Sequence, residues 1–165
     1  MARSLGLTAY RTMTRRADAR FHTPKRARPK GELIWLHAGE PDNILAVRDL
    51  GKRLMSMRSD LNVIITMVEP AHTMAPEDAS WETPVEVQLP SEHPDAIAIF
   101  LNHWAPDICI WVWGKLRPNL ILETANRRCV LFLIDADSDG FDHRDRKSVV
   151  EGKSVDLGCR RIIKK

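Results

Sequence analysis

The stretch that decides the fold is Arg28-Pro-Lys-Gly-Glu-Leu-Ile-Trp-Leu-His-Ala38, followed by Gly39-Glu-Pro-Asp-Asn43 and the apolar-periodic Ile44-Leu-Ala-Val47. Proline and glycine punctuate its start, a short apolar run follows, and a polar turn leads into helical periodicity. This pattern predicts a buried strand that delivers a polar turn to the start of a helix. In open α/β sheets such a turn, at the carboxyl end of a strand, is where sites are built. We therefore expect any chemistry of this chain to begin at Glu40 and Asp42.

The rest of the chain alternates between strand and helix patterns. Short apolar or β-branched runs predict strands at 33–38, 62–68, 85–89, 108–113 and 130–134, and helical periodicity predicts helices at 43–57, 94–104 and 118–127. A proline-containing loop is expected at 69–83. Near-continuous apolar strands separated by helices are typical of a parallel sheet that is covered on both faces. The expected fold class is α/β, with a Rossmann-like parallel sheet and helices on both faces.

The charge distribution argues against one broad class of function. Residues 1–30 hold nine Lys/Arg and one Asp, and residues 144–165 hold eight Lys/Arg and three acids. Since the whole chain carries +3, the body between these ends carries −10. A general nucleic-acid binder would have a basic body, so nucleic acid is not an expected partner. The sequence contains no run of about 18 apolar residues that could span a membrane.

The first 30 residues are predicted to form a basic leader and a linker. Residues 1–21 mix apolar side chains with arginines and lack the apolar core of a signal peptide. A basic amphipathic helix can lie in the membrane interface, with its arginines on anionic headgroups, and the alternative is a loosely ordered leader. The predicted membrane-binding residues are Arg11, Arg15 and Arg16. The prolines and basic residues between position 21 and position 31 predict the linker.

The cysteines and tryptophans mainly indicate packing. The three cysteines are widely spaced, with no CxxC pair and no histidine cluster, so a zinc site is not expected. Cys109 and Cys129 lie in apolar runs, which predicts small buried side chains in a reducing compartment. Four of the five tryptophans lie in predicted strands and helices and are expected in the core. Trp81 lies in a polar loop and is a candidate for lining a sugar or lipid site.

Three segments, in order, resemble the N-terminal domain of 3-deoxy-D-manno-octulosonic acid (Kdo) transferases. The first is Arg28-Pro29 with Gly31 and Ile34-Trp-Leu-His-Ala38. The second runs from Leu89-Pro90 to Pro106-Asp107 by way of Asp95, Phe100-Leu101 and Trp104, and the third runs from Leu116-Arg-Pro-Asn-Leu120 to Leu133-Ile-Asp-Ala136. Through this resemblance residues 31–144 are identified as an incomplete N-terminal glycosyltransferase domain.

The resemblance implies a two-domain GT-B glycosyltransferase, bound peripherally to the cytoplasmic face of the bacterial inner membrane. Such an enzyme moves Kdo from CMP-Kdo onto a lipid A precursor by an inverting transfer, with no metal ion and no cofactor beyond the donor CMP-Kdo. In the family this domain holds the lipid acceptor and supplies the base, and CMP-Kdo lies mainly on the C-terminal domain. The anionic membrane surface and the lipid A precursor are therefore the expected partners, and the chain alone is expected to be inactive.

This sequence departs from the family at the catalytic base. The family's base is a Glu after a Ser-Val-Gly triplet, six residues past the motif His, and the same count from His37 reaches Asn43. Asn43 occupies the catalytic position but cannot act as a base in the way a carboxylate can. Glu40 and Asp42 are then the candidate bases, although Asp42 also fits an N-cap of the following helix. His37 is either a substrate contact or a structural histidine.

A second departure changes the charge at the end of a strand. The family's Glu-x-Glu-Leu-Trp-Pro-Asn appears here as Trp113-Gly-Lys-Leu-Arg-Pro-Asn119. Both acids are absent, and Lys115 and Arg117 bring positive charge that favours a phosphate or carboxylate contact. With the motif residue Asn119, these two side chains are the predicted substrate-binding residues of this segment. The alternative is a pair of solvated basic residues that open a helix.

The last segment breaks the pattern of strands and helices. Residues 145–165 are polar and basic, and they resemble the translation of a sequencing-adapter read-through. We expect this tail to be non-native, with the gene truncated near residue 144 and the C-terminal domain missing; the alternative is a native basic tail. Just before it, the run from Asp135 to Gly140 matches the first half of a calcium loop. It follows a strand and has Arg146 at the twelfth position, so no metal site is expected.

Two other functions remain open on sequence grounds. The first is a non-catalytic lipid- or envelope-associated binding domain derived from the same family, favoured by Asn43 in the base position and by the basic leader. The second is another Rossmann-type or flavodoxin-like nucleotide binder. It is disfavoured because Gly39 stands alone where a glycine-rich turn would be required. We favour the transferase hypothesis.

Overall fold

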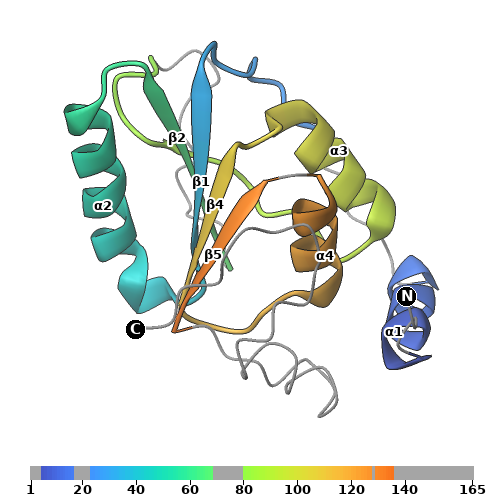
Figure 1. Cartoon of the computed structure of the whole chain (residues 1–165). Helices are drawn as coiled ribbons and strands as arrows, with labels where there is room; N and C mark the ends of the chain where they lie inside the picture. The colour runs from blue at the N-terminus through green and yellow to red at the C-terminus, as the bar shows by residue number, and fades with distance from the viewer. Residues whose placement is uncertain (1–4, 17–22, 69–79, 128, 136–165) are drawn as a thin grey trace.

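The computed structural model describes residues 5–16, 23–68, 80–127 and 129–135. Its centre is one sheet of five parallel strands in the order β3-β2-β1-β4-β5 (Figure 1). The strands are β1 (Glu32–Ala38), β2 (Leu61–Met67), β3 (Val85–Glu86), β4 (Ile108–Val112) and β5 (Val130–Ile134). The predicted α/β class with a parallel sheet is confirmed.

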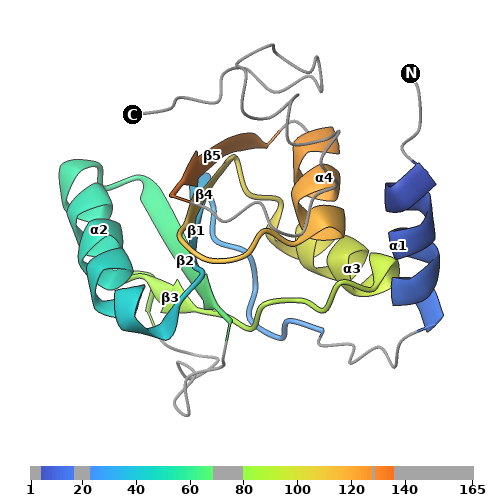
Figure 2. The ribbon, with the colours of Figure 1, turned by 90° about the horizontal axis from the view of Figure 1, so that it is seen from below.

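Helices cover both faces of this sheet. They are α1 (Leu5–Arg16), α2 (Ile44–Met57), α3 (Pro94–Trp104) and α4 (Pro118–Asn126), with a 3-10 turn, η1 (Pro41–Asn43), directly before α2. Helix α2 lies on one face, α3 and α4 lie on the other, and α1 lies outside α3 and α4 (Figure 2). The chain runs outward from β1 through β2 to β3 and then crosses back to β4. The strand order therefore reverses between β1 and β4.

The predicted strands and helices match the structure closely, with one exception. Helix α3 has the predicted bounds, and α2, α4 and the long strands differ by at most one residue at an end. The exception is the strand predicted at 85–89, which pairs with β2 only at Val85 and Glu86. Val87 still donates its N–H to the Ile65 carbonyl at 2.9 Å, and its side chain packs against the core. No described residue after Glu86 pairs with β2 in the strand ladder. Most of the loop predicted at 69–83 lies outside the described residues.

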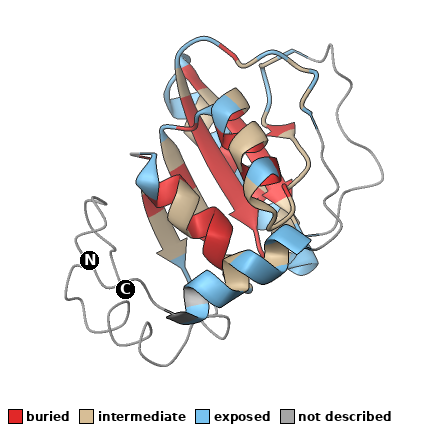
Figure 3. Ribbon diagram, turned by 90° about the vertical axis from the view of Figure 1, so that its right-hand side faces the viewer, coloured by how far each residue is buried: buried red, intermediate tan, exposed pale blue. Residues whose placement is uncertain are grey.

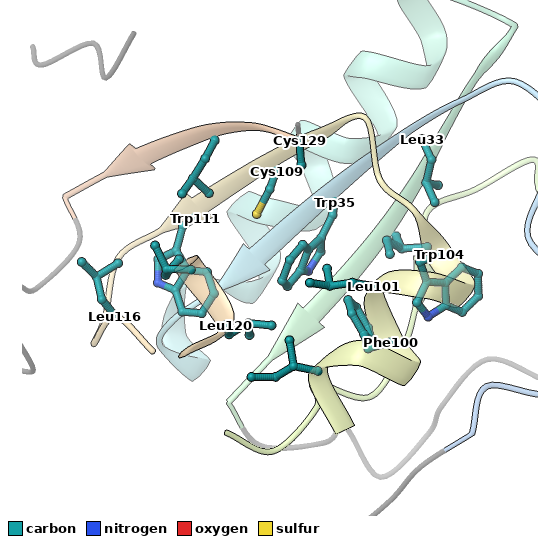
Figure 4. Packing of buried hydrophobic residues seen from close by; sticks show 14 residues of the cluster. Leu33, Trp35, Phe100, Leu101, Trp104, Cys109, Trp111, Leu116, Leu120 and Cys129 are labelled. Atoms are coloured by element: carbon teal, nitrogen blue, oxygen red, sulfur yellow. The ribbon is translucent and has the colours of Figure 1, made fainter. Parts of the chain in front are cut away.

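An aromatic core fills the side of the sheet that α3 and α4 cover (Figure 4). The Trp35 ring of β1 lies 5.1 Å from the Phe100 ring and 6.3 Å from the Trp111 ring, measured between centroids. Trp104 is buried in the same cluster, so the core positions predicted for these three tryptophans are confirmed. Cys109 and Cys129 are both buried, also as predicted.

The described part of the predicted linker, residues 23–30, is held against the end of α3 by Arg28. Arg28 donates from Nε to the Trp104 carbonyl at 2.7 Å and from Nη2 to the Ala105 carbonyl at 3.2 Å. These bonds satisfy carbonyls that a helix leaves unpaired at its C-terminal end. Arg26 lies over the Trp81 ring, 4.4 Å from its centroid, so protein already covers one face of the tryptophan that we considered for a sugar or lipid site.

Two glycines bring the turns after β1 and β4 into contact. Gly39 donates its N–H to the Val112 carbonyl at 2.9 Å, and a Cβ added at Gly39 would lie 2.0 Å from the Trp113 oxygen. A Cβ at Gly114 would lie 2.5 Å from the Gly39 oxygen, and its φ of +72° is one that glycine adopts readily. Trp113 in turn donates its N–H to the Ile134 carbonyl of β5 at 2.8 Å. Backbone contacts thus join the carboxyl ends of three strands.

We expect Gly39→Ala to lower the free energy of unfolding by about 3 kcal/mol, because the new methyl group would overlap backbone atoms that cannot rotate away. Chemical denaturation followed by tryptophan fluorescence measures this change. Gly6→Ala, at an exposed position of α1, is the matched control and should leave stability unchanged or slightly raised. A loss below about 1 kcal/mol for Gly39→Ala would show that the two turns are not locked together.

Candidate active site at the carboxyl edge of the sheet

The reversal of strand order marks one place at the carboxyl edge of the sheet. In open α/β sheets, ligands bind where neighbouring strands send their connections in opposite directions, and here these strands are β1 and β4. The turns after them, residues 39–43 and 113–117, carry five of the seven residues with predicted catalytic or substrate-binding roles. The other two are His37, in β1, and Asn119, at the start of α4.

Glu40 and Asn43 contact each other across the first turn. Glu40 is exposed and extended (φ −134°, ψ 143°), and its Oε2 accepts a hydrogen bond from Asn43 Nδ2 at 3.4 Å. The Glu40 carbonyl also accepts the Asn43 backbone N–H at 3.2 Å. The turn therefore presents one carboxylate, oriented by an amide, to the solvent. A carboxylate in this setting can accept a proton from a bound hydroxyl group.

Asp42 does not cap the helix, so that prediction is wrong. It lies in the middle of η1 and is exposed. Helix α2 begins at Ile44 with Asn43 in the N-cap position, and no side chain makes a capping hydrogen bond there. The physical reason is Pro41, whose fixed φ suits the first position of a helical turn and starts η1 ahead of α2. Asp42 is thus a second exposed carboxylate near Glu40, and its catalytic role stays a prediction.

The turn after β4 exposes Lys115 and directs Arg117 toward the protein. Trp113 has a φ of 57° and Gly114 has a φ of 72°. A left-handed conformation costs roughly 1–2 kcal/mol in a residue other than glycine, so the surroundings must hold Trp113 in place. Lys115 is exposed, whereas Arg117 is half-buried and donates from Nη1 to the Pro90 carbonyl at 3.1 Å.

Glu92 is a half-buried carboxylate that we did not single out in the sequence. Its Oε2 accepts the backbone N–H of Asn119 at 3.0 Å, and its Oε1 accepts that of Leu120 at 3.4 Å. These N–H groups belong to the first turn of α4 and have no partner within the helix. Burial raises the pKa of Glu92, while the two N–H donors and the charge of Arg117 oppose that shift. Because Glu92 lies 27 residues before Asn119, no local motif could indicate the contact.

Asn119 belongs to the same hydrogen-bond network. Its side chain is buried, and its Nδ2 donates to the Glu92 carbonyl at 3.0 Å and to Thr14 Oγ1 of α1 at 2.9 Å. Glu92 therefore occupies the N-terminus of α4, where an anionic ligand group would otherwise be favoured. Of the substrate-binding residues predicted in this segment, Lys115 is exposed, whereas Arg117 and Asn119 contact the protein itself.

His37, the fourth predicted substrate contact, lies in the core at the end of β1. Its side chain is 0% exposed, its Nδ1 lies 2.9 Å from Thr66 Oγ1, and its ring centroid lies 3.8 Å from that of Trp111. Burial and, to a smaller extent, the charge of Arg117 lower the pKa of His37 to about 3, so the ring is neutral near pH 7. Its Nε2 has no hydrogen-bond partner among the described residues. The geometry is that of a packed histidine, and a contact with substrate stays a prediction.

The three arginines predicted to bind a membrane have different surroundings. Arg15 and Arg16 are exposed at the end of α1, whereas Arg11 forms an ion pair with Glu123 of α4. Arg11 therefore helps to attach α1 to the domain, and membrane binding stays a prediction for all three. No helix in the part of the chain that the structure describes is long and apolar enough to cross a membrane.

A cavity of about 440 Å³ lies at the opposite, amino edge of the sheet. It is placed between the C-terminal ends of α3 and α4, and its lining includes Asn102, Asp107, Thr124 and Arg127. No residue with a predicted catalytic or substrate-binding role lines it. The two edges therefore offer alternative places for a ligand, and only the carboxyl edge carries the residues that sequence analysis predicted.

The fold and this edge define a class: a Rossmann-like α/β domain with a polar two-turn site where its strand order reverses. The profile of the family described as 3-deoxy-D-manno-octulosonic-acid transferase (kdotransferase), which represents an N-terminal glycosyltransferase domain, matches residues 15–139. The chain belongs to this family, and the resemblance inferred from its motifs is confirmed.

Named relatives agree with the family assignment. A protein of Arabidopsis thaliana described as "Probable 3-deoxy-D-manno-octulosonic acid transferase, mitochondrial" is 32% identical over 120 residues, which cover 71% of this chain and 26% of that protein. The 3-deoxy-D-manno-octulosonic acid transferase of Rickettsia bellii (strain RML369-C) is 27% identical over 127 residues, which cover 74% of this chain and 29% of that protein. The aligned part of the chain thus spans little more than a quarter of the length of these relatives. No solved structure matches the chain significantly.

We expect the neutral state of His37 to make the domain acid-sensitive. Its folded pKa of about 3 lies below the unfolded value of 6.5, so only the unfolded state binds this proton as the pH falls below 6.5. Stability from this group is full above pH 6.5 and declines toward pH 3, with a slope approaching about 1.4 kcal/mol per pH unit.

Denaturation at a series of pH values should give a shallower slope for His37→Phe, which keeps an aromatic ring on Trp111, than for the original chain. Carbon chemical shifts of the His37 ring provide the direct measurement and should report a neutral ring at pH 5. Equal slopes together with a protonated ring at that pH would contradict the prediction.

Proposed function

We propose that this chain is the acceptor-side domain of a glycosyltransferase that moves Kdo from CMP-Kdo to a lipid A precursor. Membership of the Kdo transferase family supports the sugar transfer. A direct role of this domain in the reaction is supported by one observation: the Glu40 carboxylate is exposed at the carboxyl end of β1 and is held by Asn43. The GT-B arrangement, the inverting course and the cytoplasmic face of the bacterial inner membrane belong to the same proposal and rest on the resemblance of the motifs.

Glu40 is the general base in this proposal. As the acceptor oxygen attacks the anomeric carbon of Kdo, its proton must leave, and the bond to CMP breaks with its electrons going to the phosphate. Glu40 has one oxygen held by Asn43, and the other makes no hydrogen bond to the described residues. That second oxygen can accept the proton. Asp42, exposed in the same turn, is the alternative base.

Lys115 supplies the positive charge of this site. It is exposed in the turn whose Gly114 touches Gly39, so an ammonium group and the Glu40 carboxylate belong to adjoining turns. The acceptor's phosphates and the acid group of Kdo are both anions that an ammonium group attracts. Arg117 adds to the positive field but is engaged with the Pro90 carbonyl, so its part is indirect.

A non-catalytic lipid-binding domain is the second candidate function. One observation favours it: the residue in the family's base position is Asn43, an amide. In that case the Glu40–Asn43 contact only stabilises the turn, and the exposed Arg15 and Arg16 would provide attraction to an anionic lipid surface. The two candidates differ in one measurable respect, which is whether the domain can supply a base.

A domain graft separates these candidates. Residues 1–139 replace the corresponding N-terminal region of the Rickettsia bellii transferase, and turnover of CMP-Kdo with a lipid A precursor is measured alongside the chain alone. We expect the graft to turn over and the chain alone to be inactive. Glu40→Gln in the graft should reduce the rate by about 100-fold or more, since general base catalysis contributes that much.

Two further variants of the graft complete the test. Asp49→Asn, which removes an exposed acid of α2 away from the site, is the control and should turn over at the original rate. Asn43→Glu restores an acid in the family's base position. A graft that binds CMP-Kdo but turns over only with Asn43→Glu would reject Glu40 as the base and favour the binding domain.

A further inference from the structure

Helix α1 is attached to the domain by polar side chains. Tyr10, Arg11 and Thr14 share one face of the helix, since positions three and four apart are neighbours, and they are its half-buried residues among those described. The rest of its described surface is exposed (Figure 3). Arg11 pairs with Glu123, near the middle of α4. The other two contacts lead to the start of α4.

Both of these contacts reach the Glu92 network, which consists of Glu92 and the groups of Asn119 and Leu120 that bond to it. Thr14 Oγ1 accepts a hydrogen bond from the Asn119 side-chain amide at 2.9 Å, and the Tyr10 side chain interacts electrostatically with the Glu92 carboxylate. Burial and the negative charge of Glu92 raise the pKa of Tyr10 to about 12, so the phenol keeps its proton and remains a donor. Helix α1 is therefore bonded to Asn119 through Thr14 and interacts through Tyr10 with the carboxylate that accepts two backbone N–H groups of α4.

The Glu92 carboxylate is half-buried, and its partners offset the cost of removing its charge from water. A buried carboxylate is costly unless it is paired and hydrogen-bonded. Its partners come from α1 (Tyr10), from the segment after β4 (Arg117, by its charge) and from α4 (Asn119 and Leu120). Loss of a donor from α1 weakens the compensation of the charge, and the carboxylate is then drawn toward water and away from α4.

This network fixes one end of the segment that carries Lys115. The other end is fixed by the backbone contact between Gly114 and Gly39. Between these two points the chain runs through Lys115 and Arg117 at the edge where we place the reaction. The end at Gly114 is a rigid backbone contact, whereas the end at Asn119 depends on hydrogen bonds to Glu92.

We propose that Glu92 is a positioning residue for the segment 115–119, and that docked α1 controls this position through Tyr10 and Thr14. The catalytic meaning of this control rests on the proposed function, whereas the mechanical coupling does not. Arg117 is held from the same loop, because its Nη1 donates to the carbonyl of Pro90, two residues before Glu92. A displacement of Glu92 thus shifts both basic residues of the segment relative to Glu40.

Amide hydrogen exchange on the full chain tests the coupling. The variants are Glu92→Gln, which removes the charge and one acceptor oxygen, and the pair Tyr10→Phe with Thr14→Val, which removes two hydroxyl groups. All three substitutions keep the size and shape of the side chain. We expect protection of the Asn119 and Leu120 amides to fall by about tenfold in both, the effect of one lost hydrogen bond to a charged group. The amides of Val63 and Ile64, buried in β2, report global stability and should keep their protection.

Arg127→Gln is the matched control, because Arg127 contacts Asn102 at the other end of α4, and it should leave the Asn119 and Leu120 amides unchanged. Unchanged protection of these two amides in Glu92→Gln would overturn the positioning role. In the α1 pair, faster exchange within α1 combined with unchanged Asn119 and Leu120 would overturn the control by α1. Unchanged exchange everywhere in the pair would do the same.

A kinetic measurement in the grafted transferase separates this proposal from the proposed function. The α1 pair should raise KM for the lipid acceptor several-fold and leave kcat nearly unchanged, because it moves the contact segment without touching Glu40. If exchange shows the coupling while the graft has no activity in any form, the coupling stands and the proposed function falls. If the graft is active but KM does not move, the positioning role in the reaction is overturned.

Discussion

The backbone contact between Gly39 and the Trp113–Gly114 turn sets the geometry on which the site depends. A reversal of strand order directs the turns after two neighbouring strands in opposite directions, but it does not by itself fix these turns relative to each other. Here the absence of a Cβ at both glycines lets the two turns touch, and the bond from Trp113 to Ile134 attaches β5 to them. The polar groups at this edge therefore extend from a rigid backbone, which is what a preorganised site requires.

A second constraint is the half-buried charge of Glu92. It occupies the N-terminus of α4 and thereby removes that anion-binding position from any ligand. Arg117 and Asn119 are engaged by the same group of residues, so Lys115 is the predicted substrate-binding residue that remains exposed. The electrostatic character of the edge follows from this arrangement: an exposed cation on one turn and exposed carboxylates on the other.

Local sequence patterns predicted the features that depend on neighbouring residues in the chain, such as the bounds of helices and strands. Helix α3 could be bounded correctly because Pro94 marks its start and its apolar residues repeat at helical spacing up to Trp104. The same local reasoning failed for Asp42, because a polar residue before a periodic segment is compatible with both an N-cap and the 3-10 turn that forms. It also could not decide between the two roles of His37, since burial of that ring depends on Thr66 and Trp111 in neighbouring strands.

Contacts between positions far apart in the sequence could not be predicted, for a different reason. The bonds of Arg28 to the end of α3 and of Glu92 to the start of α4 join residues 76 and 27 positions apart. Whether a charged residue is solvated or holds another element depends on the packing of the whole sheet, which one sequence does not display. The family, by contrast, could be recognised, because its motifs lie in the strands and turns that local patterns do reveal.

The most direct test of this account asks which edge of the sheet binds the acceptor. Amide chemical shifts of the isotope-labelled chain can be followed while a lipid A precursor in detergent micelles is added, with identical empty micelles as the control. We predict changes at Glu40, Asp42, Asn43, Gly114 and Lys115, with Asp107 and Arg127 at the amino-edge cavity unaffected. Changes confined to the amino edge, or none at saturating acceptor, would contradict the assignment of the carboxyl edge as the acceptor site.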